Sequence, residues 1–312
     1  MKRARRIIGG TLARREAIAF YAFIGPWIVG MLVFTLYPLV ASLYYSLTDF
    51  NGAQMNFIGL ENYRRMFSEP MFYQSLWVTF RYVSVVVPLN MIAALSLAML
   101  MNQQIPALSF WRTVYFLPSV ISGVASAMLW RWVLNPDMGL LNSFLSMVGI
   151  QGPRWFWDEN WALPSYWLMS LWSVGGSMVI YLAGLQGVPT ALYEAAELDG
   201  ANAWQRLTRI TLPMISPVLL FTFITNLITS FQVFTQVFVI SGQGAGGGLS
   251  LGGPNGATMM YVLYLVSNGI RAARLGYGSA LSWVLFVIIM AFTVLFMWVS
   301  RRVVYYEDER AR

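Results

Sequence analysis

The side chains that could do chemistry in this chain are almost all hydroxyls and amides. The sequence contains no cysteine and no histidine, which removes thiol nucleophiles, imidazole bases and the commonest metal ligands. Polar residues do recur between positions 214 and 240 at intervals of 3, 4, 3 and 4, at Thr222, Thr225, Thr229, Gln232 and Gln236. On an α-helix these positions share one face within about 80° of arc. Such a face can bind a polar solute or can hydrogen-bond to a neighbouring helix.

Two further clusters have the same ambiguity. Ser119, Ser122 and Ser126 would share a helix face, where small residues more often allow close packing than line a cavity. A tryptophan cluster at Trp155, Trp157 and Trp161 is more typical of a membrane-interface belt than of sugar stacking. The neighbouring acids Asp158 and Glu159 could instead meet an external partner. No catalytic residue and no metal site is expected.

The elements that position these residues must lie in lipid. Of the 312 residues 58% are hydrophobic and only 11% are charged, against roughly 25% charged in a soluble domain. Charge-free stretches each supply the roughly 20 apolar residues that a membrane-spanning helix needs. They predict an all-α integral membrane protein with about six spans, near 18–41, 77–101, 111–134, 163–186, 214–240 and 279–300.

The ends of the chain set its orientation. Half of the 20 basic residues lie within 1–17 and 301–312, and cytoplasmic segments accumulate such residues. Six spans also return both termini to one side, so we expect both to be cytoplasmic. The first apolar run is longer than the core of a cleavable signal peptide and ends without a small-residue cleavage site, so we expect the first span to be uncleaved. The net charge of +7 therefore indicates membrane orientation and not nucleic-acid binding. The expected regions are 1–17, 18–76 with the first span, 77–300 as the core, and 301–312.

Two segments outside the spans are also predicted. The glycine-rich run 242–256 should form an external loop. Met259–Val266 is apolar but too short to cross, and we expect an interfacial helix there.

The segment 187–213 predicts two short helices between the fourth and fifth spans. Thr190 can cap the first, which runs over the strong helix formers of Ala191–Leu198. Gly200 can end it in a left-handed conformation. A second helix over Ala203–Ile210 would then lead to Pro213 at the start of the fifth span.

This segment resembles the EAA loop of binding-protein-dependent ABC importer permeases. Glu194-Ala195-Ala196 is followed after three residues by Gly200, and after nine more by Ile210-x-Leu212-Pro213, so every fixed position matches. The resemblance implies the type I ABC importer permease fold and a coupling element that inserts into a separate ATPase subunit. The positions that it assigns to coupling are Glu194, Ala195, Ala196, Asp199, Gly200, Ala201, Leu212 and Pro213.

Further motifs resemble the carbohydrate-uptake branch, of the maltose and glycerol-phosphate type. They are Phe57–Tyr63, Tyr115–Pro118, Gly252–Pro254 and Leu275–Ala280, although Gly278 stands where Ala is common. The maltose-type permeases of this branch contact sugar from the fourth and fifth spans. The resemblance therefore implies a substrate path for a sugar or oligosaccharide, with candidate residues Ser173, Gly176, Thr225, Thr229, Gln232 and Gln236.

The implied assembly has a second homologous permease, two ATP-binding cassette subunits and an extracytoplasmic solute-binding protein, in the bacterial cytoplasmic (inner) membrane. The chain itself contains no phosphate-binding loop, so it is not expected to be an enzyme, and ATP and Mg²⁺ would bind to the partner ATPase. Glycerol phosphate or a phosphodiester remains an alternative solute, with Arg81 as the only base near a span interior. An ion-coupled secondary transporter or an intramembrane enzyme would need buried acids, which the predicted spans lack.

Overall fold

The computed structural model describes residues 2–241 and 250–301, and the side chains from residue 12 onward. The chain forms two compact units, residues 1–66 with 268–283, and residues 67–267 with 284–312. Among the described residues, four helices are long and apolar enough to cross a membrane, and two bent helix pairs raise the number to six. The predicted all-α membrane architecture with about six spans is therefore confirmed. Most of the predicted run 242–256 lies outside the described residues.

The first unit begins with one long helix, formed by α1 (Lys2–Met31), a π-helical turn (Leu32–Leu36) and α2 (Tyr37–Tyr45). Pro38 is the second residue of α2, with only Tyr37 between it and the π turn. Because proline has no amide hydrogen and crowds the carbonyl four residues earlier, a wider turn at this place lets the helix continue. The same unit contains most of α3 (Glu61–Ser68) and the beginning of α16 (Leu275–Ser300).

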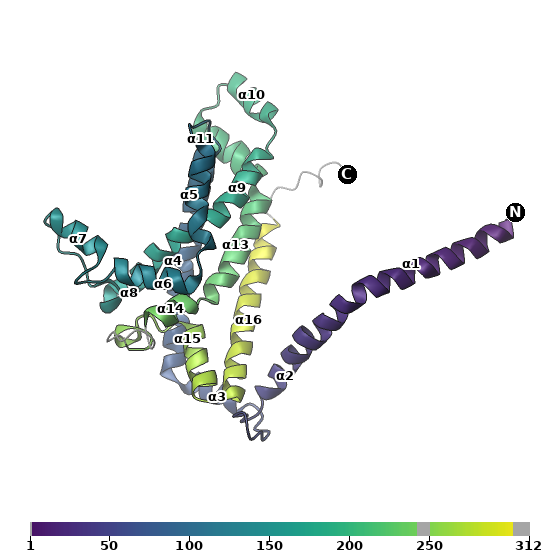
Figure 1. Cartoon of the computed structure of the whole chain (residues 1–312), viewed down its shortest axis with the longest axis horizontal. Coiled ribbons are helices and arrows are strands. Elements are labelled where there is room, and N and C mark those ends of the chain that lie inside the picture. Colours follow the sequence, from purple (N-terminus) through teal and green to yellow (C-terminus); the bar gives the residue numbers. More distant parts are fainter. Residues whose placement is uncertain (1, 242–249, 302–312) are drawn as a thin grey trace. The chain divides into compact units, whose positions relative to one another are not determined.

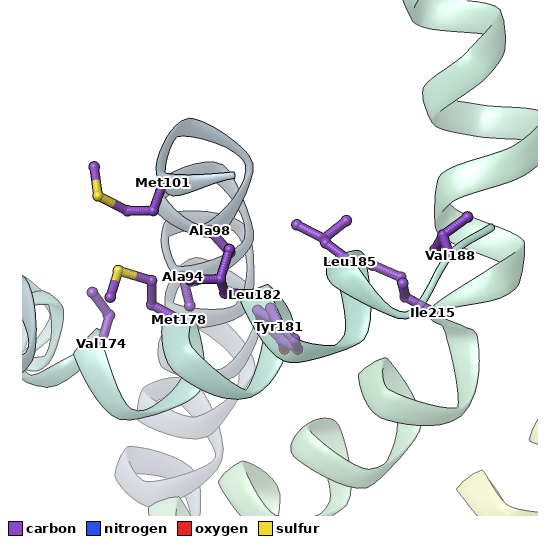
Figure 2. Packing of buried hydrophobic residues seen from close by; sticks show 10 residues of the cluster. All are labelled: Ala94, Ala98, Met101, Val174, Met178, Tyr181, Leu182, Leu185, Val188 and Ile215. Atoms are coloured by element: carbon purple, nitrogen blue, oxygen red, sulfur yellow. The ribbon is translucent and has the colours of Figure 1, made fainter. Parts of the chain in front are cut away.

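The second unit is built on α4 (Pro70–Met101), which packs against α9 (Gly175–Gln186) and α13 (Ser216–Phe231). At the centre of this packing, Ala94 and Ala98 of α4 face Met178 of α9, and all three are fully buried (Figure 2). Small side chains let two helix backbones approach closely in lipid, where packing and not water exclusion drives association.

The predicted third span is not straight. It consists of α5 (Leu108–Val120) and α6 (Gly123–Val133), which are bent by 100°. Ser122 is the N-cap of α6, and its hydroxyl accepts a hydrogen bond from the Ala125 amide at 3.3 Å. A straight helix over 111–134 was therefore the wrong expectation, because Ser122 caps a new helix instead of continuing the face of Ser119 and Ser126.

The fourth span is also bent, by 49°, between α8 (Glu159–Ser170), with its short 3₁₀ extension to Ser173, and α9. Gly175 lies at this bend, and a Cβ there would stand 2.1 Å from the Tyr115 carbonyl oxygen of α5. Only glycine permits so close an approach of the two helices.

The fifth span is divided into α13 and α14 (Thr235–Ile240), with Gln232–Phe234 between them. The uninterrupted helix over 214–240 was thus wrong, and the common helical face ends at Thr229. The predicted helix at Met259–Val266 forms as α15 (Tyr261–Val266), which packs against α4 with Tyr261 and Leu263 fully buried.

Candidate functional site

A polar cavity of about 430 Å³ lies in the second unit, where the helix breaks of the third, fourth and fifth spans meet. Non-helical backbone within a membrane protein is tolerated where it lines a cavity. Hydroxyl and amide side chains from α4, the α5–α6 pair, the α8–α9 pair and the α13–α14 pair line it. The polar members of its wall are Tyr82, Asn90, Ser119, Ser126, Tyr166, Ser170, Ser173, Ser177, Asn226, Thr229, Ser230, Gln232, Thr235 and Gln236.

The structure brings four of the six predicted path residues into this wall, namely Ser173, Thr229, Gln232 and Gln236. Gln232 and Gln236 reach it through the break at Gln232–Phe234 and not through a continuous helical stripe. Thr225 is absent from the wall, and its hydroxyl donates instead to the Phe221 and Thr222 carbonyls of its own helix. Gly176 does not line the cavity either.

Thr222, which shares the predicted face, serves helix packing. It is buried, and its hydroxyl lies 2.7 Å from the phenolic oxygen of Tyr181 on α9. The polar face that the sequence suggested therefore has two roles. Thr222 bonds to a neighbouring helix, and Thr229 opens to the cavity.

Sequence reasoning missed two asparagines of the cavity wall. Asn90 on α4 accepts a hydrogen bond from the Ser170 hydroxyl at 3.0 Å. Asn226 on α13 has a buried Nδ2 atom without a hydrogen-bond partner among the described residues. A buried amide donor without a partner is costly, so it is a strong candidate to bind a solute hydroxyl. Asn90 could have been noticed as an amide inside a long apolar stretch.

The wall of the polar cavity is uncharged among the residues that the structure describes there. Arg81, the base expected nearest the path, is exposed and does not belong to it. Neutral donors and acceptors of this kind can bind many hydroxyl groups at once, each of which both donates and accepts.

The segment 187–213 forms a second candidate site, at one end of the second unit (Figure 1). Its first helix, α10 (Thr190–Leu198), begins after Pro189 and not after Thr190, so the predicted Thr190 cap is wrong. Pro189 has an extended backbone conformation, with φ −59° and ψ 128°, so it lies outside the helix. Thr190 is therefore the first helical residue.

The predicted end of α10 is confirmed. Gly200 has φ +75°, the left-handed conformation. Its amide donates to the Glu197 carbonyl at 3.0 Å, and the Ala201 amide donates to the Ala196 carbonyl at 2.9 Å. This pair of bonds is the Schellman motif, which satisfies the last carbonyls of the helix and turns the chain sharply.

The second helix follows at once as α11 (Ala203–Arg206). Asn202 and Gln205 form a reciprocal capping box, with bonds of 2.8 and 2.9 Å between each side chain and the other's amide. The helix then widens into a π turn (Leu207–Thr211) just before Pro213 and continues through α12 (Leu212–Met214), so it is longer than the predicted Ala203–Ile210.

Two side-chain contacts hold α10 against this second helix. Glu197 forms an ion pair with Arg206, and the Tyr193 and Thr211 hydroxyls lie 2.9 Å apart. With the Schellman turn and the capping box, they fix the angle between the two helices. The segment is therefore a defined projection and not a flexible connection.

The outer surface of this projection is acidic and apolar. Of the predicted coupling residues, Glu194, Ala195, Asp199 and Gly200 are exposed, whereas Ala196, Ala201, Leu212 and Pro213 are half-buried. Sequence reasoning missed Leu198 and Trp204, which are 91% and 70% exposed on either side of Gly200. Exposed apolar side chains that flank a fixed turn mark a contact surface.

Two motifs far apart in the sequence meet in the first unit. Asn62 donates to the Ser46 and Thr48 carbonyls at 2.9 and 2.8 Å. The Gly276 amide donates to the Phe50 carbonyl at 2.8 Å. The sequences around Phe57–Tyr63 and Leu275–Ala280 are thus explained by the packing of one loop on the start of α16.

Gly278 also has a structural reason. A Cβ there would stand 2.7 Å from the Cα of Gly269, so the two glycines pack backbone against backbone. An alanine at this position would not fit here without a shift.

Part of the tryptophan cluster beside α8 packs into the fold, whereas Trp161 is 45% exposed. Trp155 is buried, and its indole donates to the Asn142 side chain at 2.7 Å. Asp158 caps α8 by accepting from the Asn160 and Trp161 amides. Glu159 accepts from the Asn255 amide group at 2.7 Å. These three side chains therefore make structural contacts within the protein.

The spans, the uncharged polar cavity and the fixed projection at one end define a multi-pass membrane transport subunit. Residues 72–305 match the family described as "Binding-protein-dependent transport system inner membrane component". The chain belongs to this family of inner-membrane permeases, so its recognition as an ABC importer permease is confirmed.

Curated relatives match over almost the whole chain. The chain is 39% identical to "Probable ABC transporter permease protein YesP" of Bacillus subtilis (strain 168), over 99% of this chain and 97% of the relative. It is 33% identical to "Trehalose/maltose transport system permease protein MalF" of Thermococcus litoralis, over 93% and 96%. It is also 33% identical to "Lactose transport system permease protein LacF" of Rhizobium radiobacter, over 93% and 97%.

A solved structure has the same fold. A chain in the crystal structure of a bacterial alginate ABC transporter, in complex with an alginate pentasaccharide-bound periplasmic protein, superposes with a TM-score of 0.80 at 24% identity. The superposition covers 92% of this chain and 96% of that one. The predicted type I importer fold is confirmed.

Proposed function

We propose that this permease forms half of the membrane path for a sugar or oligosaccharide. The observation that carries this proposal is the uncharged wall of hydroxyls and amides, including the unsatisfied Asn226 amide. The relatives named for trehalose, maltose and lactose support it. The wall of the polar cavity itself offers no cation to a phosphate group, since none of its described residues is one.

In this proposal, ATP and Mg²⁺ bind to a separate pair of ATPase subunits, and the projection of α10 and α11 couples them to the path. The exposed Glu194, Leu198 and Trp204 give it a surface for a protein partner. A second permease completes the path, and an external binding protein delivers the solute. Family membership favours this assembly over an ion-coupled transporter or an intramembrane enzyme.

The orientation is part of the same proposal, with both termini and the projection in the cytoplasm. The chain has no cysteine, so single cysteines can be introduced without a background. Impermeant thiol reagents should reach residues 60 and 145 from outside, and residues 105 and 200 only from inside. Labelling of residue 200 from outside would exclude the coupling role.

The solute itself is tested on the binding protein encoded with this permease. Purified from cells grown on mixed oligosaccharides, that protein should release a sugar on denaturation, identified by mass spectrometry. A phosphodiester or an amino acid in its place would refute the sugar assignment and leave the permease assignment standing.

A further inference from the structure

A second cavity, of about 510 Å³, lies in the second unit where α6 ends. We call it the arginine cavity. Its charged and aromatic wall consists of Arg131, Trp132, Asp137, Arg154 and Trp157. Its two arginines exceed its one carboxylate, so it carries a net positive charge, in contrast to the uncharged polar cavity.

The two cavities lie along the same pair of packed helices, α6 and α14. On α6, Ser126 lines the polar cavity and Arg131 lines the arginine cavity. Five residues of helix separate them, about 7.5 Å along the axis. On α14, Gln236 lines the polar cavity and Val239 lines the arginine cavity, about 4.5 Å further along the helix axis. A solute longer than one ring could therefore touch both walls.

The side chains of the arginine cavity suit an anionic group carried on a sugar ring. Arginine binds carboxylates and phosphates through two parallel hydrogen bonds, a geometry that lysine does not offer. The indoles of Trp132 and Trp157 offer flat apolar surfaces, and the apolar face of a sugar ring can lie on them. Asn135 accepts from the Asp137 and Met138 amides at 2.9 Å, which fixes the turn that presents Asp137. Its carboxylate can accept from ring hydroxyls.

We propose that the arginine cavity binds the carboxylate of an acidic sugar unit, so that the oligosaccharide of this permease contains a uronic acid. The proposal rests on the proposed function, since it names the class of sugar that the path admits. An acidic protein partner could also use the two arginines. A concave, tryptophan-lined site directly beside the polar cavity favours the solute.

The test uses the purified complex of this chain with its permease and ATPase partners, without the binding protein. Binding of digalacturonic acid is compared with that of its methyl ester, which has the same rings but no charge, by microscale thermophoresis. The acid should bind at least about tenfold more tightly than the ester, because each charge-assisted bond that the ester loses is strong.

Two variants test whether the preference for the acid over the ester arises in the arginine cavity. Arg131→Gln and Arg154→Gln should each remove it and leave the affinity for the ester unchanged. Arg81→Gln is the matched control, because this exposed arginine lines neither cavity, and it should retain the preference. Arg154 is exposed, so its variant should fold even if that of Arg131 does not.

Equal affinity for acid and ester, or a preference that survives Arg154→Gln, would overturn the inference. Loss of binding-protein association in Arg154→Gln with an intact acid preference would show a docking surface for protein and would also overturn it. Binding of the ester without a preference for the acid refutes the acidic-sugar inference alone. Failure of every sugar to bind to the complex or to enter vesicles would refute the proposed function itself.

Discussion

Substitution of Gly200 tests whether the turn of the projection couples the permease to its ATPase. Gly200 has φ +75°, and a Cβ placed there meets no atom of the described residues within 4 Å. An L-residue in this conformation costs about 1–2 kcal/mol. Gly200→Ala should therefore reduce the population of the turn by a factor of about 5 to 30. The added methyl group clashes with nothing in the part of the chain that the structure describes.

Gly200→Leu has the same backbone cost but adds a side chain between the exposed Leu198 and Trp204. If this surface fits into the ATPase, Leu should abolish uptake, whereas Ala should only reduce it. Both variants should remain in the membrane at normal levels. The assay is uptake in reconstituted vesicles, with co-purification of the ATPase measured on the same preparation.

Gly149 provides the control, since it has φ +77° and equally open surroundings in a loop that the proposed orientation places outside. Gly149→Leu should leave ATPase association intact. If Gly200→Leu transports normally with the ATPase bound, the projection is not the coupling element. Equal losses in the Ala and Leu variants would show that backbone strain, and not contact with the partner, carries the effect.

Three further substitutions separate path from packing. Gln232→Leu should impair uptake or shift its selectivity without lowering the melting temperature, because this exposed side chain lines the polar cavity; a pure stability loss would remove it from the path. Thr222→Val should leave uptake unchanged and lower the free energy of unfolding by about 0.6 kcal/mol, because the hydrogen bond to Tyr181 is lost. Unchanged stability with altered uptake would contradict a packing role for Thr222. Gly278→Ala should destabilise the chain by about 1–3 kcal/mol, because the added methyl group overpacks against Gly269; a melting temperature at or above that of the unchanged protein would refute this close packing.

Local signals in the sequence predicted the projection well. Gly200 occupies the left-handed turn as expected, because glycine alone adopts it without cost. The capping box of Asn202 and Gln205 is equally local but was not predicted, and the first cap was assigned to Thr190 instead of Pro189. Features that depend on a few neighbouring residues can be read from the chain.

The polar cavity could be predicted only in part. Helical periodicity grouped Thr222 with Thr229, but the contact of Thr222 with Tyr181 joins two spans and is invisible in either one alone. The break after Phe231 contains neither glycine nor proline, so no local signal marks it. Asn226 became a candidate only when its buried amide lacked a partner.

The motifs of the first unit show the same limit. Asn62 and Gly276 belong to two separate motifs in the sequence. In the structure both hydrogen-bond to the same loop, Asn62 to the Thr48 carbonyl and the Gly276 amide to the Phe50 carbonyl. The glycine at position 278 is explained only by its close backbone packing against Gly269. Such contacts join residues that are distant in the sequence, so they cannot be predicted from the sequence alone.

The most direct test of the central claim is transport by the reconstituted assembly. Vesicles containing this chain with its second permease and ATPase subunits receive the sugar-loaded binding protein outside and ATP inside. The sugar should accumulate above its external concentration only when ATP and the binding protein are both present. Accumulation driven by an ion gradient without ATP, or uptake that does not need the binding protein, would contradict the account.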